Sequence, residues 1–381
     1  MIRSKCKLII LALTAAFCAI GLACFPADAA QGASSGLTFC IQVLIPSSFP
    51  FLVLSSFFVH SGLSQRLGRL LCPITRFLFR LPGSCGATIL LSLAGGYPVG
   101  TRGIATLYQN RTISQKQANQ MFYFCVNAGP AFTISVIGAG LYGSPRLGLY
   151  LFVSGTVASL ILGIVLGQLS RKQNTPIEQP ETPKPAVPWG DALVLSAFDA
   201  ARGMVSACSF VILFATALSL FERVGFLPWL CKALSAIGLP PAFAESMFPL
   251  LWEITGGSAQ GVLLGAPLPL VAFAAGFAGL CVHFQVLATA TPFHPSRWKF
   301  FLVRLIHGGI SAGCVTALLH LFPVPMAGPV VDVFHNTSDM LHGSLSAVNA
   351  PPVRAVAAGA VLIALCMVLI LSNFRRSQRN L

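Results

Sequence analysis

A few polar side chains lie inside long apolar stretches of this sequence, beside residues that interrupt helices. Glu253 opens the motif EITGG (253–257), Asn127 lies in CVNAGPAF (125–132), and Gln285 ends CVHFQ (281–285). A carboxylate in such a place can hold a proton, a cation, or a solute hydroxyl or amine, and an amide can both donate and accept hydrogen bonds. These residue types predict a site that binds a small polar solute.

The candidate binding residues share a position at or beside a glycine or proline interruption. They are Gly95, Gly96, Tyr97 and Pro98 of GGYPVG, then Asn127, Gly129 and Pro130, then Glu253, Thr255, Gly256 and Gly257, and finally Gln285. Two of them have a second interpretation, because Asn127 could only pack helices through its amide and Glu253 could lie at the mouth of a loop. His283 is two residues from Gln285 on a helix and is expected on another face.

Chemistry of other kinds has little support in the sequence. Arg304 and His307 are three residues apart and could face one another, but an arginine near a membrane surface more often extends to the headgroups. GGYPVG lacks the lysine and hydroxyl residue of a phosphate-binding loop. No nucleophile motif, paired carboxylates or metal-ligand spacing occurs, so we expect no enzyme activity, no metal and no cofactor.

The composition predicts an integral membrane protein. Of 381 residues, 55% are hydrophobic and 9% are charged, and the mean hydropathy is +0.79. Such a chain needs a bilayer around it. The formal net charge of +14 comes from short basic runs between apolar stretches, which is typical of cytoplasmic loops, and nucleic-acid binding is therefore not expected. The 12 cysteines show no metal or redox spacing and are interpreted as small buried residues.

The apolar stretches predict about eight membrane-spanning helices and two broken segments. The spans are 8–25, 36–60, 121–141, 147–168, 203–220, 268–288, 300–322 and 355–372, and the broken segments are 84–100 and 243–265. The first span resembles a signal peptide, because small residues follow it, but its length favours an uncleaved helix. A basic amphipathic stretch covers 65–82, and a proline-rich polar linker follows the fourth span.

Two halves of the chain repeat the same order of features. LAGG (93–96) matches ITGG (254–257) at a displacement of 161, and Ala128–Gly129 matches Ala278–Gly279 at a displacement of 150. If both broken segments are re-entrant, all but four of the 24 basic residues lie on the cytoplasmic side, as the bias of basic residues requires. Each half then crosses the membrane three times, so the halves form an inverted-topology repeat.

These features divide the chain into six parts. They are an N-terminal transmembrane helix (1–35), a first repeat (36–168), a cytoplasmic linker (169–202), a second repeat (203–322), an extracytoplasmic loop (323–354) and a C-terminal transmembrane helix with a basic tail (355–381).

Six motifs in order resemble those of the sporulation integral membrane protein family YlbJ. They are PSSFPF (46–51), RLPGS (80–84) leading into GGYPVG, CVNAGPAF, GSPRLG (143–148), EITGG and CVHFQ. The resemblance implies two copies of the Gate, or nucleoside-recognition, domain, a place in the bacterial cytoplasmic membrane, and a role in endospore formation, particularly of the spore cortex. It implies no particular transported substrate.

Taken together, the sequence predicts an all-α integral membrane protein, with both termini cytoplasmic, that transports a small polar solute. A membrane scaffold for cortex assembly and an intramembrane enzyme acting on a lipid-linked precursor are the alternatives. The expected partners are the lipid bilayer and the solute, and the sequence leaves a homo-oligomer open.

Overall fold

The computed structural model describes residues 19–172 and 186–324, and all regular structure in those two ranges is helical. Five described helices are long and apolar enough to cross a membrane, and a sixth span results if the bent pair Leu63–Phe79 and Gly83–Gly95 counts as one. This confirms an all-α membrane fold. The expected last span, most of the preceding loop, residues 173–185 of the linker, and residues 8–18 of the first span lie outside the described residues.

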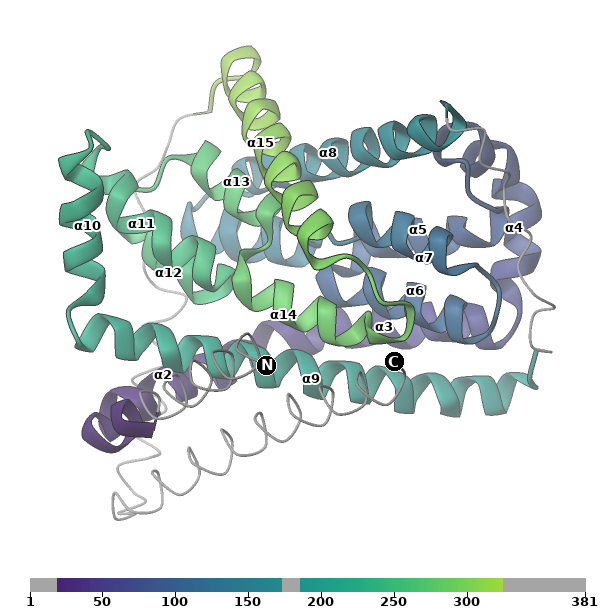
Figure 1. Ribbon diagram of the computed structural model, residues 1–381, viewed down its shortest axis with the longest axis horizontal. Helices are drawn as coiled ribbons and strands as arrows, with labels where there is room; N and C mark the ends of the chain where they lie inside the picture. The colour runs from purple at the N-terminus through teal and green to yellow at the C-terminus, as the bar shows by residue number, and fades with distance from the viewer. Residues whose placement is uncertain (1–18, 173–185, 325–381) are drawn as a thin grey trace, which may run out of the picture.

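Each helix of the first half has a counterpart in the second half, in the same order (Figure 1). The first set is α2 (Pro26–Phe39) continuing through η1 (Cys40–Leu44) into α3 (Ile45–His60), then α4 (Leu63–Ile74) with η2 (Thr75–Phe79), η3 (Gly83–Cys85) with α5 (Gly86–Gly95), α6 (Tyr97–Gln109), α7 (Gln115–Phe124), η4 (Ala131–Leu141) and α8 (Pro145–Lys172). The second set is α9 (Trp189–Arg223), α10 (Phe226–Ala236), α11 (Pro241–Trp252), α12 (Ile254–Leu263), α13 (Leu268–Phe277), α14 (Gly279–Thr289) with η5 (Thr291–Phe293), and α15 (Arg297–Leu321).

Matching turns support this correspondence. Gly62 precedes α4 and Gly225 precedes α10, and both have a φ of 75°, which is a left-handed conformation that suits glycine. The final helices also begin alike, since α8 starts at Pro145 of the SPR sequence and α15 starts at Arg297 of the PSR sequence.

The corresponding long helices of the two halves pack side by side in opposite directions. The start of α2 lies against the end of α9, where Asp28 pairs with Arg223 at 3.5 Å. The end of α3 lies against the first half of α9, where His60 pairs with Asp199 at 3.0 Å. Antiparallel counterparts are what an inverted-topology repeat requires. The short helices α4 and α10 lie at opposite ends of the molecule, as the same relationship demands (Figure 1).

Both broken segments turn back on themselves as helical hairpins. In the first hairpin, a methyl group added to Gly103 of α6 would lie 2.8 Å from Cγ2 of Thr88 on α5. In the second hairpin, one added to Gly261 of α12 would lie 3.0 Å from Cγ of Leu250 on α11. Small residues allow the two arms to approach this closely. Both segments predicted to be broken are thus hairpins, as a re-entrant segment requires, and the side of the membrane from which they enter stays a prediction.

Two expected spans are not continuous helices. The span predicted at 121–141 is divided by a non-helical stretch from 125 to 129, and Pro130, which has no amide hydrogen to donate, starts the next helical segment. The span predicted at 268–288 turns at Ala278 and Gly279, whose φ angles are 73° and 52°. The two breaks occupy equivalent places in the two halves.

Some expected part boundaries fall within helices of the structure. The helical segment that begins at Pro26 runs through to His60 and crosses the boundary expected at residue 35. Helix α9 begins at Trp189, so the second part of the expected linker is helical.

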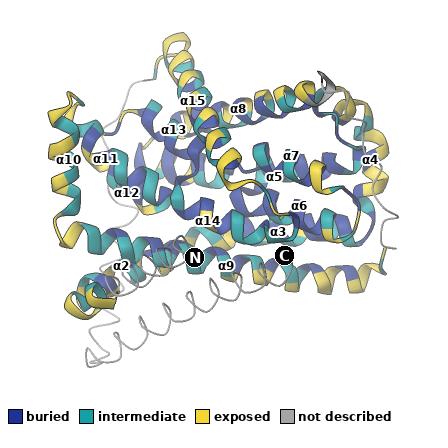
Figure 2. Cartoon of the chain, in the orientation of Figure 1, coloured by how far each residue is buried: buried dark blue, intermediate teal, exposed yellow. Residues whose placement is uncertain are grey.

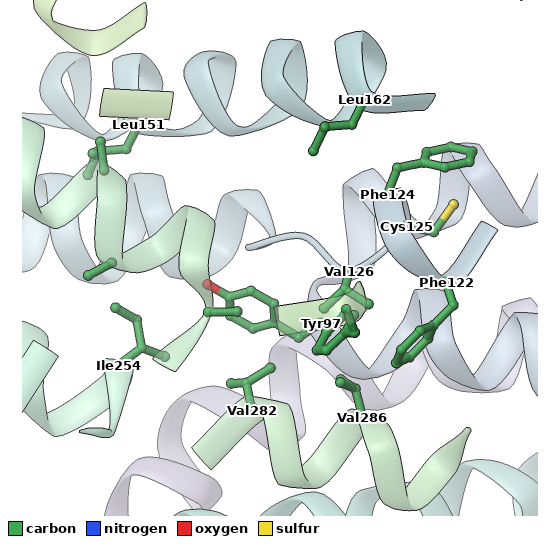
Figure 3. Packing of buried hydrophobic residues seen from close by; sticks show 14 of the residues in the cluster. Tyr97, Phe122, Phe124, Cys125, Val126, Leu151, Leu162, Ile254, Val282 and Val286 are labelled. Atoms are coloured by element: carbon green, nitrogen blue, oxygen red, sulfur yellow. The ribbon is translucent and has the colours of Figure 1, made fainter. Parts of the chain in front are cut away.

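The core lies where the two halves meet. Buried side chains concentrate in the hairpins and in the broken helices, while α4 and α10 carry much exposed surface (Figure 2). One apolar cluster contains Tyr97 and Val126 from the first half together with Ile254 and Val282 from the second, and Figure 3 shows these four side chains near one another. The tips of the hairpins are therefore held by shared packing.

Candidate functional site

The tips of both hairpins meet at one partly enclosed cavity of about 50 Å³. A buried water needs roughly 10–15 Å³ of such space, so the cavity holds about three or four waters. Its lining comes from both repeats: Phe39, Val43, Leu44, Ser47, Ser48, Ala94, Gly95, Gly96, Tyr97, Pro98, Gly129, Ala131, Phe132, Val211, Glu253, Ile254, Thr255, Val282 and Gln285. Eight of the twelve predicted binding residues are in this set.

The first hairpin turns at Gly96 with a backbone that glycine alone adopts readily. Its φ is 88° and its ψ is −175°, in a region essentially restricted to glycine. A methyl group on Gly129 would lie 3.0 Å from the Gly96 nitrogen, so the break after α7 crosses the hairpin tip at backbone contact. Helix α6 then begins at Tyr97 without a side-chain cap, and its positive end adjoins the cavity.

The second hairpin turns at Glu253, which is 1% exposed. Its backbone is extended, with φ −142° and ψ 109°, and its carboxylate caps α12. Oε1 accepts hydrogen bonds from the amide and the hydroxyl of Thr255 at 3.0 and 2.5 Å, and Oε2 accepts one from the Gly256 amide at 2.6 Å. These partners are all neutral, and the amides of the helix N-terminus favour the ionised carboxylate while burial favours the protonated acid. Glu253 therefore places a group that can take up or release a proton at the cavity wall.

A second crossing repeats the geometry of the first. A methyl group on Gly279 would lie 3.2 Å from the Ile254 nitrogen. The break between α13 and α14 therefore crosses the tip of the second hairpin, as Gly129 crosses the first. Each repeat thus brings two interrupted helices together at membrane depth, where protein or a cavity must cover irregular backbone.

Gln285, Ser47 and Ser48 supply the remaining polar side chains of the cavity lining. Within the described residues, Nε2 of Gln285 has no hydrogen-bond partner although it is buried, so it is a donor available to a ligand. Sequence reasoning missed the two serines. They belong to PSSFPF, and its two prolines inside an apolar stretch were the signal that could have found them, although α3 runs through both prolines as one helix.

Four predicted residues do not line the cavity. Asn127 is buried outside this lining, where its Nδ2 donates to the Phe124 carbonyl at 3.1 Å and to Ser159 Oγ at 3.2 Å. These two bonds fit the packing interpretation, while its buried Oδ1 has no partner among the described residues, so its role in binding stays a prediction. Pro130, Gly256 and Gly257 are also outside the lining. The second helix break is at Glu253, three residues before Gly256, because the carboxylate caps the new helix there.

His283 and Arg304 lie outside the cavity lining as well. His283 is on α14 but its Nδ1 bonds the Gly279 carbonyl at 2.7 Å, so it points away from Gln285 as its spacing predicts. Arg304 does not extend to the membrane surface. It is 0% exposed, donates to the Gly276 carbonyl at the end of α13, and lies 3.3 Å from His307, where a cation complements the helix C-terminus.

Among the described residues, no three His, Cys, Asp or Glu side chains are grouped to hold a metal ion. The arrangement at the cavity can therefore bind by hydrogen bonds and by the charge of one carboxylate. Whether these residues bind a solute remains a prediction.

Comparisons with known proteins agree with the motif resemblance. Residues 41–145 match the Gate family model, which is described as nucleoside recognition. The chain is 27% identical over 342 residues to the sporulation integral membrane protein YlbJ of Bacillus subtilis (strain 168), covering 83% of this chain and 84% of that protein. No solved structure matches. The resemblance to the YlbJ family and to the Gate domain is confirmed, and the chain is an integral membrane protein. The family model matches one Gate domain, in the first repeat, so the second copy stays a prediction.

Proposed function

We propose that this chain is a non-enzymatic transporter of a small polar solute that acts during sporulation, and that the cavity between the hairpin tips is its binding site. The sporulation role follows the name of the Bacillus subtilis relative. The observation that supports transport best is the convergence of both repeats on one buried cavity with polar groups. Broken helices that meet near the midplane of an inverted repeat are the usual construction of a transporter site.

Glu253 is the residue on which we base the chemistry of binding. Its carboxylate is buried at the cavity wall and its hydrogen-bond partners are neutral. A negative centre in that position favours a cation, a proton, or an amine or hydroxyl of the solute. The free donor of Gln285 and the hydroxyl of Ser48 complement an acceptor and a donor on the same solute.

A solute larger than a few waters requires the hairpins to separate, since the cavity is about 50 Å³. Each hairpin crosses one interrupted helix of its own repeat at backbone contact, at Gly129 and at Gly279. Sliding at one crossing while the other stays closed would open the cavity toward one side of the membrane. Alternation between the two openings is the transport cycle that we propose.

The orientation in the membrane is part of the proposal. Most of the described basic residues lie at the end of the molecule that holds α4, the turn after α6, and the starts of α9 and α15. Arg146, Arg223 and Lys232 lie toward the other end. Gln115 at that turn donates to the Phe293 carbonyl at 3.1 Å, just before α15, which brings these segments together. The bias of basic residues toward the cytoplasm places that end inside.

The test compares sporulating cells that carry the wild-type chain, Glu253→Gln, or no copy. We expect the small polar metabolites of cells without the chain to change, wild type to restore them, and Glu253→Gln to fail at normal abundance in the membrane. Glu245→Gln is the matched control, because Glu245 is an exposed carboxylate of the same hairpin, and it should behave as wild type. A metabolite found in this way is then tested for uptake by the purified chain in vesicles.

The outcomes separate transport from the alternatives. If Glu253→Gln supports normal cortex formation, the carboxylate is structural and a scaffold becomes the better explanation. If wild type changes the metabolite pool but the purified chain moves no identified metabolite across vesicles, the transport proposal fails.

A further inference from the structure

The amphipathic segment formed by α4 and η2 presents three distinct faces. The face that packs on the rest of the molecule contains Ser64, Gly68, Thr75 and Phe79, which are all buried. Gly68 makes the closest approach, since a methyl group there would lie 2.7 Å from the Ser84 nitrogen. This face fixes how the segment is rotated, and therefore what the other two faces present.

The second face is an exposed apolar stripe. Leu67, Leu70, Ile74 and Phe77 are 37%, 75%, 54% and 75% exposed. At about 100° per residue these four side chains fall within roughly 80° of the helix circumference. No described side chain covers that stripe, and four large apolar side chains in one narrow arc indicate contact with acyl chains.

The third face is basic. Arg66, Arg69 and Arg76 are exposed and fall within another arc of about 80°. This basic arc borders the apolar stripe and lies away from the face that packs on the core. A helix with an apolar arc beside a basic arc lies in the plane of a membrane surface, with its apolar side chains in the acyl region and its cations among the headgroups. The position of the segment at one end of the long axis agrees with this orientation (Figure 1).

We propose that this segment is a binding surface for anionic phospholipid headgroups, held in the leaflet by the apolar stripe. The counterpart helix α10 supplies the internal comparison. It carries the exposed apolar side chain of Trp229, at 63%, and Ile237 just after it is 75% exposed, but Lys232 is its one basic residue. The two ends of an otherwise repeated architecture therefore differ in charge, and the anionic-lipid surface belongs to the α4 end alone. This inference does not depend on transport.

The test uses the full-length chain in phosphatidylcholine vesicles that contain increasing fractions of a photoreactive phosphatidylglycerol. We expect cross-links in 63–79 to saturate at a lower lipid fraction than those in 226–236. Each arginine changed to glutamine should weaken the phosphatidylglycerol dependence roughly fivefold, and Arg66→Gln/Arg69→Gln/Arg76→Gln together roughly a hundredfold. High salt should reduce wild-type labelling in the same direction.

Three controls make the result specific. Arg66→Lys/Arg69→Lys/Arg76→Lys together should retain most labelling, because a point charge suffices for headgroup attraction. Lys232→Gln should leave labelling of 63–79 unchanged. The glutamine triple variant should unfold at the wild-type temperature in pure phosphatidylcholine, which excludes misfolding. Equal labelling of 63–79 in wild type and in the glutamine triple variant would overturn the proposal, as would equal saturation at 226–236.

Discussion

Arg102 Nη2 donates to Asp199 Oδ1 at 2.5 Å, joining the return arm of the first hairpin to the long helix of the second repeat. His60 holds the other oxygen of Asp199 at 3.0 Å. At the opposite end of α9, Gln260 Nε2 donates to Glu222 Oε1 at 2.5 Å, joining the return arm of the second hairpin to the same helix. The return arm of each hairpin is therefore tied to α9, at opposite ends of the molecule. The first arm of the second hairpin adds a further contact, in which Trp252 Nε1 donates to the Phe214 carbonyl of α9 at 3.0 Å.

The contact of Asp199 predicts a measurable loss of stability when its charge is removed. Asp199→Asn should lower the free energy of unfolding by about 2 kcal/mol, because hydrogen bonds to charged groups contribute roughly 1.5–3 kcal/mol. Thermal unfolding of the purified chain measures it, and a double-mutant cycle with Arg102→Gln isolates the pair. Arg223→Gln is the control, since the Arg223 side chain is 57% exposed and a surface pair contributes about 1 kcal/mol or less. Equal effects of Asp199→Asn and Arg223→Gln would contradict the prediction.

The re-entrant hairpins could be predicted from the sequence because glycine and proline interrupt helices at fixed places in both halves. The same order of features in both repeats indicated a broken segment at the matching place in each. The positions of the basic residues then favoured the inverted arrangement of the two repeats. The antiparallel packing of Asp28 on Arg223 and of His60 on Asp199 agrees with that choice.

The exact place of the second break could not be predicted from glycines. Gly256 and Gly257 attract attention because glycine weakens helices, yet both lie inside α12. Gly257 is needed because the α11 backbone at Pro249 approaches it closely. The break depends on the Glu253 carboxylate, which accepts hydrogen bonds from the amides of the turn that follows. A sequence pattern does not show that this side chain turns back onto its own helix.

Replacing Gly96 at the tip of the first hairpin should impair function by more than the loss of stability explains. Gly96→Ala should cost about 1–3 kcal/mol, because its φ of 88° is strained for alanine, and it should abolish function. Gly238→Ala is the matched control, since Gly238 has a φ of 90° but no atom within 4 Å of an added methyl group. Thermal unfolding should show similar losses for both variants, whereas sporulation should fail only with Gly96→Ala. Failure in both would show that stability alone decides the phenotype.

Replacing Asn127 should lower the stability of the protein and leave its function unchanged. Its amide donates to Ser159 Oγ, which in turn donates to the Phe124 carbonyl at 2.6 Å. Asn127→Ala should cost on the order of 1 kcal/mol, as hydrogen bonds between membrane helices do, and Ser159→Ala should be less than additive with it. Unfolding measurements on both single variants and the double variant test this. Loss of function in Asn127→Ala at wild-type stability would return this residue to the site.

The unequal distribution of basic residues between the two ends of the molecule predicts which introduced cysteines an impermeant thiol reagent can reach from outside the cell. Lys116 lies at the end that holds Arg66 and Arg102, and Lys232 lies at the other end on α10; both are exposed in the structure. With the accessible native cysteines replaced, Lys232→Cys should react in intact cells, because few basic residues gather at its end and that end is therefore outside. Lys116→Cys should react only after the membrane is permeabilised, which also controls for its reactivity. Labelling of Lys116→Cys in intact cells would place the basic end outside, and the anionic-lipid surface of α4 would then face the other leaflet.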